Sequence, residues 1–117
     1  MNTTWHFSLH ENIQLLQLGD LLSEDINKAV LQEMDAHLKE GYVDYVIDMG
    51  AVNFINSIGL NLLIIMQKRA RKSEGKLVLA RASTTVVKLL KMTKLYPLFE
   101  LEDSLEAAFI TFQAQKN

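Results

Sequence analysis

Few side chains in this sequence could do catalytic or metal-binding chemistry. The 117 residues contain no cysteine, which excludes disulfides, thiolate catalysis and cysteine-ligated metals and suits a reducing compartment. The three histidines, His6, His10 and His37, form no HExxH pattern and make a poor set of metal ligands. The sequence also has no G-x-S-x-G elbow, Walker loop or GxGxxG. It therefore predicts no enzyme, no cofactor and no metal site.

The most informative stretch runs from Val46 to Leu60 and reads VIDMGAVNFINSIGL. Its first part is typical of a buried strand, and an irregular connection then leads to a helix that begins near Ser57. Open α/β sheets place their functional loops at the carboxyl ends of strands. The simplest interpretation of Ser57 is a helix N-cap, whose hydroxyl accepts from a first-turn amide and contributes about 1 kcal/mol.

Five strands are predicted around this stretch. Alternation of Trp5, Phe7 and Leu9 with polar residues is typical of a half-buried strand, and the short Glu11-Asn12 turn predicts an antiparallel hairpin. The other strands are expected at residues 13–18, 43–49, 77–80 and 98–101.

Four helices are predicted after the hairpin. The first begins at the N-cap Ser23 and ends before Gly41. The second begins near Ser57, is apolar nearly all round over 60–66, and closes at Gly75. The remaining boundaries are a cap at Ser83 or Thr84 for the third helix and a capping box of Asp103 and Glu106 for the fourth.

The predicted fold is therefore α/β, with the order β-β-α-β-α-β-α-β-α in one domain over 1–117. A single mixed β-sheet is expected, with an antiparallel N-terminal hairpin and helices packed on it. The strand order stays open at this point.

Charge and hydropathy indicate a cytoplasmic domain. The net charge of −2 and pI of about 5.9 give no global basic field for nucleic acid. The cations between Lys68 and Lys72 are interpreted as a solvated face at a helix C-terminus. The N-terminus lacks the pattern of a signal peptide, and the apolar run Leu60–Met66 is too short to span a bilayer.

Two short motifs in this element order resemble the STAS domain (sulphate transporter and anti-sigma factor antagonist). One is Asp48-Met49 at a strand end followed by Asn56-Ser57-Ile58-Gly59-Leu60 at a helix start. The other is Gln17-Leu18-Gly19-Asp20-Leu21 between the second strand and the first helix. The resemblance covers essentially the whole chain. The sequence departs from the family pattern at Asn56, where aspartate is usual, and at Ile58, where a second residue with a hydroxyl group is common.

The resemblance implies an anti-sigma factor antagonist of bacterial transcription control in which Ser57 is the phosphorylated residue. The implied partner is an anti-sigma factor that is also a serine kinase of the histidine-kinase-like ATPase fold, with a serine phosphatase that restores the serine. A phosphate would be tolerated at the helix N-terminus but would disturb docking. The residues expected to bind the partner are Asn56, Ile58, Gly59, Gly19, Asp20, Leu21, Ser23 and Glu24.

Two alternative functions stay open from the sequence. Asn56 favours a non-switching STAS module, either a scaffold or an accessory subunit of a membrane transport complex. The other is a small enzyme or nucleotide-binding domain, although no glycine-rich phosphate loop supports it. Ile58 is either an exposed apolar contact or a residue tucked under the loop. The oligomeric state is left between a monomer and a weak dimer.

Overall fold

The computed structural model describes residues 5–20 and 23–113, and within them strands and helices follow the predicted order. The strands are β1 (Trp5–His10), β2 (Ile13–Leu18), β3 (Asp44–Asp48), β4 (Leu77–Ala80) and β5 (Glu100–Glu102). The helices are α1 (Glu24–Lys39), α2 (Ser57–Lys72), α3 (Thr84–Met92) and α4 (Leu105–Gln113), with a short 3-10 helix η1 (Tyr96–Leu98). The predicted α/β class is confirmed.

The strands form one mixed sheet in the order β1-β2-β3-β4-β5. β1 pairs with β2 in the predicted antiparallel hairpin, and β2 to β5 are parallel neighbours. Gln17 of β2 lies opposite Asp48 of β3, so the segments that follow these two strands leave the sheet at the same edge.

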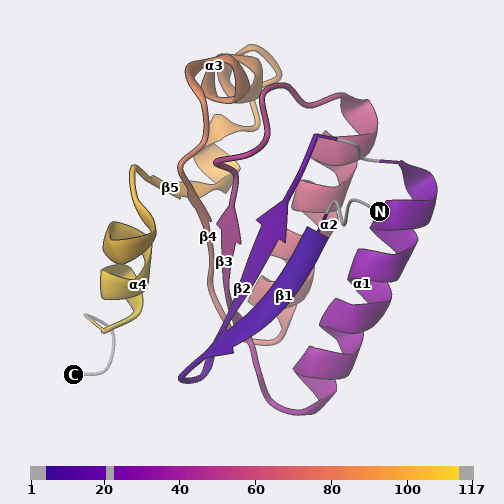
Figure 1. Ribbon diagram of the computed structural model, residues 1–117, viewed down its shortest axis with the longest axis vertical. Helices are drawn as coiled ribbons and strands as arrows, with labels where there is room; N and C mark the ends of the chain where they lie inside the picture. The colour runs from indigo at the N-terminus through magenta and orange to yellow at the C-terminus, as the bar shows by residue number, and fades with distance from the viewer. Residues whose placement is uncertain (1–4, 21–22, 114–117) are drawn as a thin grey trace.

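Helices cover both faces of the sheet. Right-handed crossovers that always step in the same direction put the connecting helices on one side. Figure 1 shows α1 and α2 on one face and α4, drawn in yellow, on the other. The contacts agree, because α1 packs on α2, α2 packs on β4, and α4 contacts β3, β4 and β5.

The core follows from this layering. The larger apolar cluster lies between the sheet and the helices α1, α2 and α3, with fully buried Leu16, Tyr45 and Met66 among its members. The smaller cluster joins strand residues such as Val46 to Phe112 of α4. The central strands are therefore buried on both faces, as their continuous apolar runs predict.

The C-terminal boundaries differ from the prediction. Pro97 lies in η1, because its fixed φ suits the first turn of a helix, and this turn delays β5 to Glu100–Glu102. Helix α4 has no capping box of Asp103 and Glu106. Instead the hydroxyl of Ser104 accepts from the amide of Ala107 at 3.0 Å, which places the cap one residue later.

In the described part of the chain, no helix has both the length and the apolar character needed to cross a lipid bilayer.

Candidate functional site

Ser57 is the first residue of α2, and it is exposed at the carboxyl end of β3. The helix is capped by the preceding residue, because Oδ1 of Asn56 accepts from the amide of Gly59 at 2.9 Å. The interpretation of Ser57 as the N-cap is therefore wrong. Asparagine is among the strongest capping residues, so the hydroxyl after it is not needed for the fold. Among the described residues this hydroxyl has no hydrogen-bond partner.

The start of α2 is electrostatically suited to an added negative charge. The helix is 16 residues long, and its first turn contains no acidic side chain. The positive end of its dipole is therefore not neutralised locally. Asn56 caps the helix without charge, whereas an aspartate there would repel an anion on the next residue. A phosphate on Ser57 would lie against amide groups that favour it.

A first polar tether holds the β3–α2 connection against the β2–α1 connection. Asp20 accepts two hydrogen bonds from Asn53, one from its backbone amide at 2.6 Å and one from its side-chain amide at 2.9 Å. These hydrogen bonds lower the pKa of Asp20 from its usual value, the backbone amide contributing most. The carboxylate therefore stays ionised and keeps both bonds at neutral pH.

A second tether joins α1 to the first turn of α2. The side-chain amide of Asn27 donates to the carbonyl oxygen of Ile58 at 2.9 Å. Asn27 is buried, and a hydrogen bond gains strength from the lower dielectric constant of a protein interior. Together the two tethers hold the backbone around Ser57 in one orientation. This function of Asn27 was not apparent from the sequence.

Phe54 is a large apolar side chain presented to solvent beside Ser57. It is 60% exposed, whereas Val52 and Ile55 on either side of it are buried. The buried neighbours anchor the connection, and the Asp20–Asn53 tether precedes Phe54 directly, so the ring is held outward. Phe54 was not predicted from the sequence as a binding residue, although an aromatic side chain in an irregular connection was an available signal.

The other predicted binding residues have different degrees of access. Gly19 and Asp20 are half-buried where β2 ends, next to the end of β3. Ser23 is exposed and caps α1 through the amide of Ile26 at 3.2 Å, and Glu24 is exposed in the first turn. Leu21 lies outside the described residues.

The α2 residues after Ser57 are less accessible. Ile58 is half-buried, so it is neither a fully exposed apolar contact nor a residue fully tucked under the loop. Gly59 is buried beneath the cap.

Asp48, at the end of β3, is held in an ion pair and has a structural role. Its carboxylate is 3% exposed and accepts from Nε and Nη2 of Arg81 at 2.9 and 2.8 Å, and from the amide of Gly50 at 2.9 Å. Burial raises the pKa of Asp48, but these hydrogen bonds and the charge of Arg81 outweigh it, so the pKa lies below its usual value. The pair fixes the start of the connection that leads to Ser57.

The histidines do not gather at this site. His6 and His10 lie on β1, and Nε2 of His37 lies 3.1 Å from Oε2 of Glu33 on α1. No group of three or more metal-binding side chains comes together within the ranges 5–20 and 23–113.

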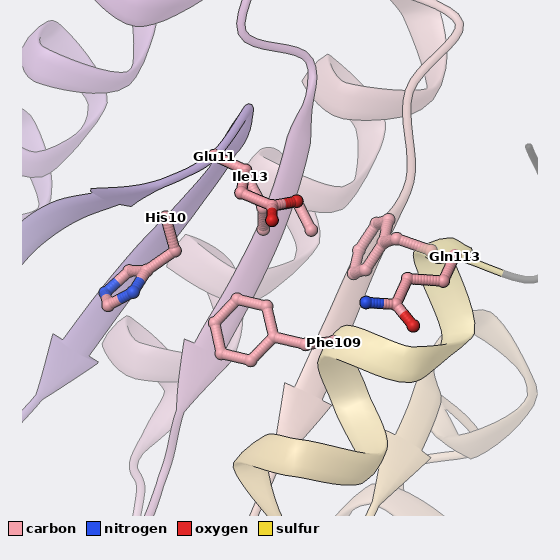
Figure 2. A pocket seen from close by; sticks show the side chains of 6 residues that line it. His10, Glu11, Ile13, Phe109 and Gln113 are labelled. Carbon is pink, nitrogen blue, oxygen red and sulfur yellow. The ribbon is translucent and has the colours of Figure 1, made fainter.

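A cavity of about 370 Å³ lies away from Ser57. Figure 2 shows Phe109 of α4 facing the end of the β1–β2 hairpin, with His10 and Glu11 on the hairpin side. Ile13, which also lines the cavity, begins β2, whereas Ser57 follows the opposite ends of the parallel strands. The cavity is therefore not part of the Ser57 site.

Known proteins resemble this chain both in sequence and in structure. The family model of the STAS domain matches residues 9–108. BtrV of Bordetella bronchiseptica, a protein assigned the role of anti-sigma factor antagonist, is 27% identical over 92 residues, which cover 75% of this chain and 79% of BtrV.

Several solved structures share the fold. TM1081 of Thermotoga maritima, a protein assigned the role of anti-sigma factor antagonist, has a TM-score of 0.83 at 17% identity, with 93% of this chain and 94% of that chain covered. Unphosphorylated SpoIIAA, also an anti-sigma factor antagonist, has a TM-score of 0.80 at 15% identity, with 97% and 99% covered. A phosphorylated form of SpoIIAA from Bacillus has a TM-score of 0.73 at 15% identity, with 92% and 98% covered.

The same fold occurs within a membrane transporter. The murine anion transporter Slc26a9 has a TM-score of 0.72 at 16% identity, with 89% of this chain but only 18% of that chain covered. At these identities the structural likenesses show the fold alone.

Proposed function

Because this chain belongs to the STAS domain family, we propose that it is an anti-sigma factor antagonist whose docking is switched off by phosphorylation of Ser57. The observation that carries the proposal is the exposed Ser57 hydroxyl, which the Asn56 cap leaves unused at the start of α2. A switch residue has to be accessible to a kinase and dispensable for folding. Ser57 meets both requirements.

The proposed partner is an anti-sigma factor that is also a serine kinase of the histidine-kinase-like ATPase fold. The assigned role of BtrV supports an anti-sigma factor as the partner, and the existence of a phosphorylated SpoIIAA supports phosphorylation of the domain. The ATPase fold of the kinase is what the sequence resemblance implies. A serine phosphatase would return the protein to its docking form. The role belongs in the cytoplasm, where sigma factors act, and it requires no catalytic residue in this chain.

The proposed docking surface consists of the exposed residues of the two tethered connections, with Phe54 at its centre. Asn56 and Ser57 extend it along α2, and Ser23 and Glu24 extend it onto α1. The tethers from Asp20 and Asn27 reduce the conformational entropy that docking would otherwise remove. An exposed aromatic ring on a rigid loop is the type of residue that dominates binding energy in protein interfaces.

Replacing Phe54 with alanine is expected to weaken partner binding at least tenfold, or roughly 1.4 kcal/mol. The physical reason is loss of apolar area that the partner would bury. Because Phe54 is 60% exposed, the free energy of unfolding should change little. Isothermal titration calorimetry with the partner measures the first effect, and urea unfolding measures the second.

Ile110→Ala is the matched control for this change, since Ile110 is 52% exposed on α4, away from the proposed surface. Equal affinity losses for the two variants would show that Phe54 is not at the docking surface.

The phosphorylation step is tested by incubating the protein with its candidate kinase and ATP, followed by intact-mass analysis. We expect one added phosphate on the wild-type chain and none on Ser57→Ala. A phosphate that persists in Ser57→Ala would place the modification elsewhere. Peptide mapping identifies the modified residue in either case.

The second candidate function is a non-switching STAS module, either a scaffold or an accessory subunit of a membrane transport complex. Asn56 in place of the usual aspartate favours it, and so does the occurrence of the fold in Slc26a9. It predicts a stable complex with the partner but no phosphate after incubation with the kinase.

A further inference from the structure

A groove on the C-terminal half of α2 lies outside the proposed docking surface. It has a volume of about 310 Å³ and is lined by residues of α2 and of the segment around η1: Ile64, Gln67, Lys68, Arg71, Leu98 and Phe99. The four α2 residues follow the i, i+3, i+4, i+7 spacing and form one stripe of the helix. At 1.5 Å rise per residue they lie about 10–20 Å along the helix from Ser57.

The floor of the groove is apolar and partly open. Ile64 is half-buried, Phe99 is 8% exposed, and Leu98 is 42% exposed. A hollow of this size has room for an aliphatic side chain from another molecule. Burial of a leucine side chain typically contributes about 1.5–3 kcal/mol.

The groove carries two cations and no acidic lining residue. Lys68 and Arg71 are both exposed, and among the described residues neither forms an ion pair. Their neighbour Arg69, in contrast, lies 3.0 Å from Asp35 of α1. The solvated cations Lys68 and Arg71 therefore give the groove a positive surface that is complementary to carboxylates of another molecule.

Gln67 links the two sides of the groove. Its Nε2 donates to the carbonyl of Leu98, which ties α2 to the segment around η1. Its Oε1 is buried with no hydrogen-bond partner among the described residues. An oxygen buried in this way is out of reach of another molecule, so Gln67 contributes to the shape of the groove and not to its polar contacts.

We propose that this groove binds an extended acidic segment of a partner protein. One aliphatic side chain of the segment lies in the hollow over Ile64, Leu98 and Phe99. Flanking carboxylates pair with Lys68 and Arg71. The protein thus has a second binding surface that does not depend on the state of Ser57.

The test uses the ¹⁵N-labelled full chain and a synthetic peptide, acetyl-Glu-Glu-Leu-Glu-Glu-amide. In NMR titrations we expect saturable amide shifts centred on residues 64–71 and 98–99. The double variant Lys68→Glu/Arg71→Glu should weaken binding at least tenfold. The control Lys28→Glu/Lys88→Glu makes the same charge change on exposed residues of α1 and α3, and it should have less than a twofold effect.

The outcomes separate specific docking from its alternatives. Equal weakening by both double variants, or an unchanged affinity when the peptide leucine is replaced by serine, would reduce the result to general charge attraction and overturn the proposal. Binding of single-stranded DNA but not of the peptide would also overturn it. Ser57→Glu should bind the peptide like the wild type, so failure of the Ser57 switch leaves this test unaffected.

Discussion

Replacing Ser57 with glutamate is expected to lower affinity for the anti-sigma factor partner about 100-fold, or roughly 3 kcal/mol. Docking would bring the new carboxylate into a partly dehydrated interface, where an unpaired charge is costly. The fold should not suffer. The side chain is exposed at the first position of α2, and the helix dipole favours a negative charge there. Calorimetric titration gives the affinity, and thermal unfolding checks the stability.

Ser57→Gln is the matched control, because glutamine has the size of glutamate without its charge. We expect it to bind at least ten times more tightly than Ser57→Glu. If both variants lost affinity equally, the effect would be steric, and the electrostatic account of the switch would be wrong.

Replacing Gly75 with alanine is expected to lower the free energy of unfolding by about 3 kcal/mol or more, although it adds a single methyl group. A Cβ at this position would overlap the backbone carbonyl of Val43, which cannot move without disturbing the entry to β3. Relief of the overlap would also strain the bond from the amide of Gly75 to the carbonyl of Ala70 at the end of α2. Urea unfolding measures the loss.

Gly41→Ala provides the comparison. Gly41 has φ +95°, a left-handed conformation that alanine adopts with strain, but no atom lies within 4 Å of the Cβ position. We expect a loss of about 1 kcal/mol. A Gly75→Ala protein that is at least as stable as Gly41→Ala would contradict the close approach of Gly75 to Val43.

Local patterns in the sequence predicted the elements and the layered fold well. The alternation from Trp5 to Leu9 corresponds to β1, and the segment between the N-cap Ser23 and Gly41 corresponds to α1. The Glu11-Asn12 turn predicted the hairpin. These features depend on residues close in the chain, so their physical causes are visible in the sequence. The strand order depends on distant pairings and came only from the structure.

Cap assignments failed where two polar residues were adjacent. Asn56 caps α2 in place of Ser57, and Ser104 caps α4 in place of Asp103. Each pair contains two acceptable caps, and the backbone path into the helix selects between them. The end of α2 near Gly75 also has a cause that the sequence does not show. Glu74, and not glycine, adopts the left-handed conformation, with φ 65°. Position 75 requires glycine because a Cβ there would overlap Val43.

The motif around Ser57 and the turn around Gly19 were predicted to lie at the same end of the sheet, and the parallel pairing of β2 and β3 agrees. The contacts that hold these two segments together were not predicted. Asp20 accepts hydrogen bonds from Asn53, which is 33 residues away in the sequence. Asn27 donates one to Ile58, which is 31 residues away. No local pattern encodes such pairs. The exposure of Phe54 likewise depends on the burial of Val52 and Ile55 against the core.

The central claim is that a phosphate on Ser57 prevents docking and leaves the domain folded. The most direct test prepares the stoichiometrically phosphorylated and unmodified forms and titrates both into the same kinase partner, with the melting temperature of each recorded. We predict tight binding by the unmodified form, about 100-fold weaker binding by the phosphorylated form, and closely similar melting temperatures. Equal affinities of two folded forms would contradict the account.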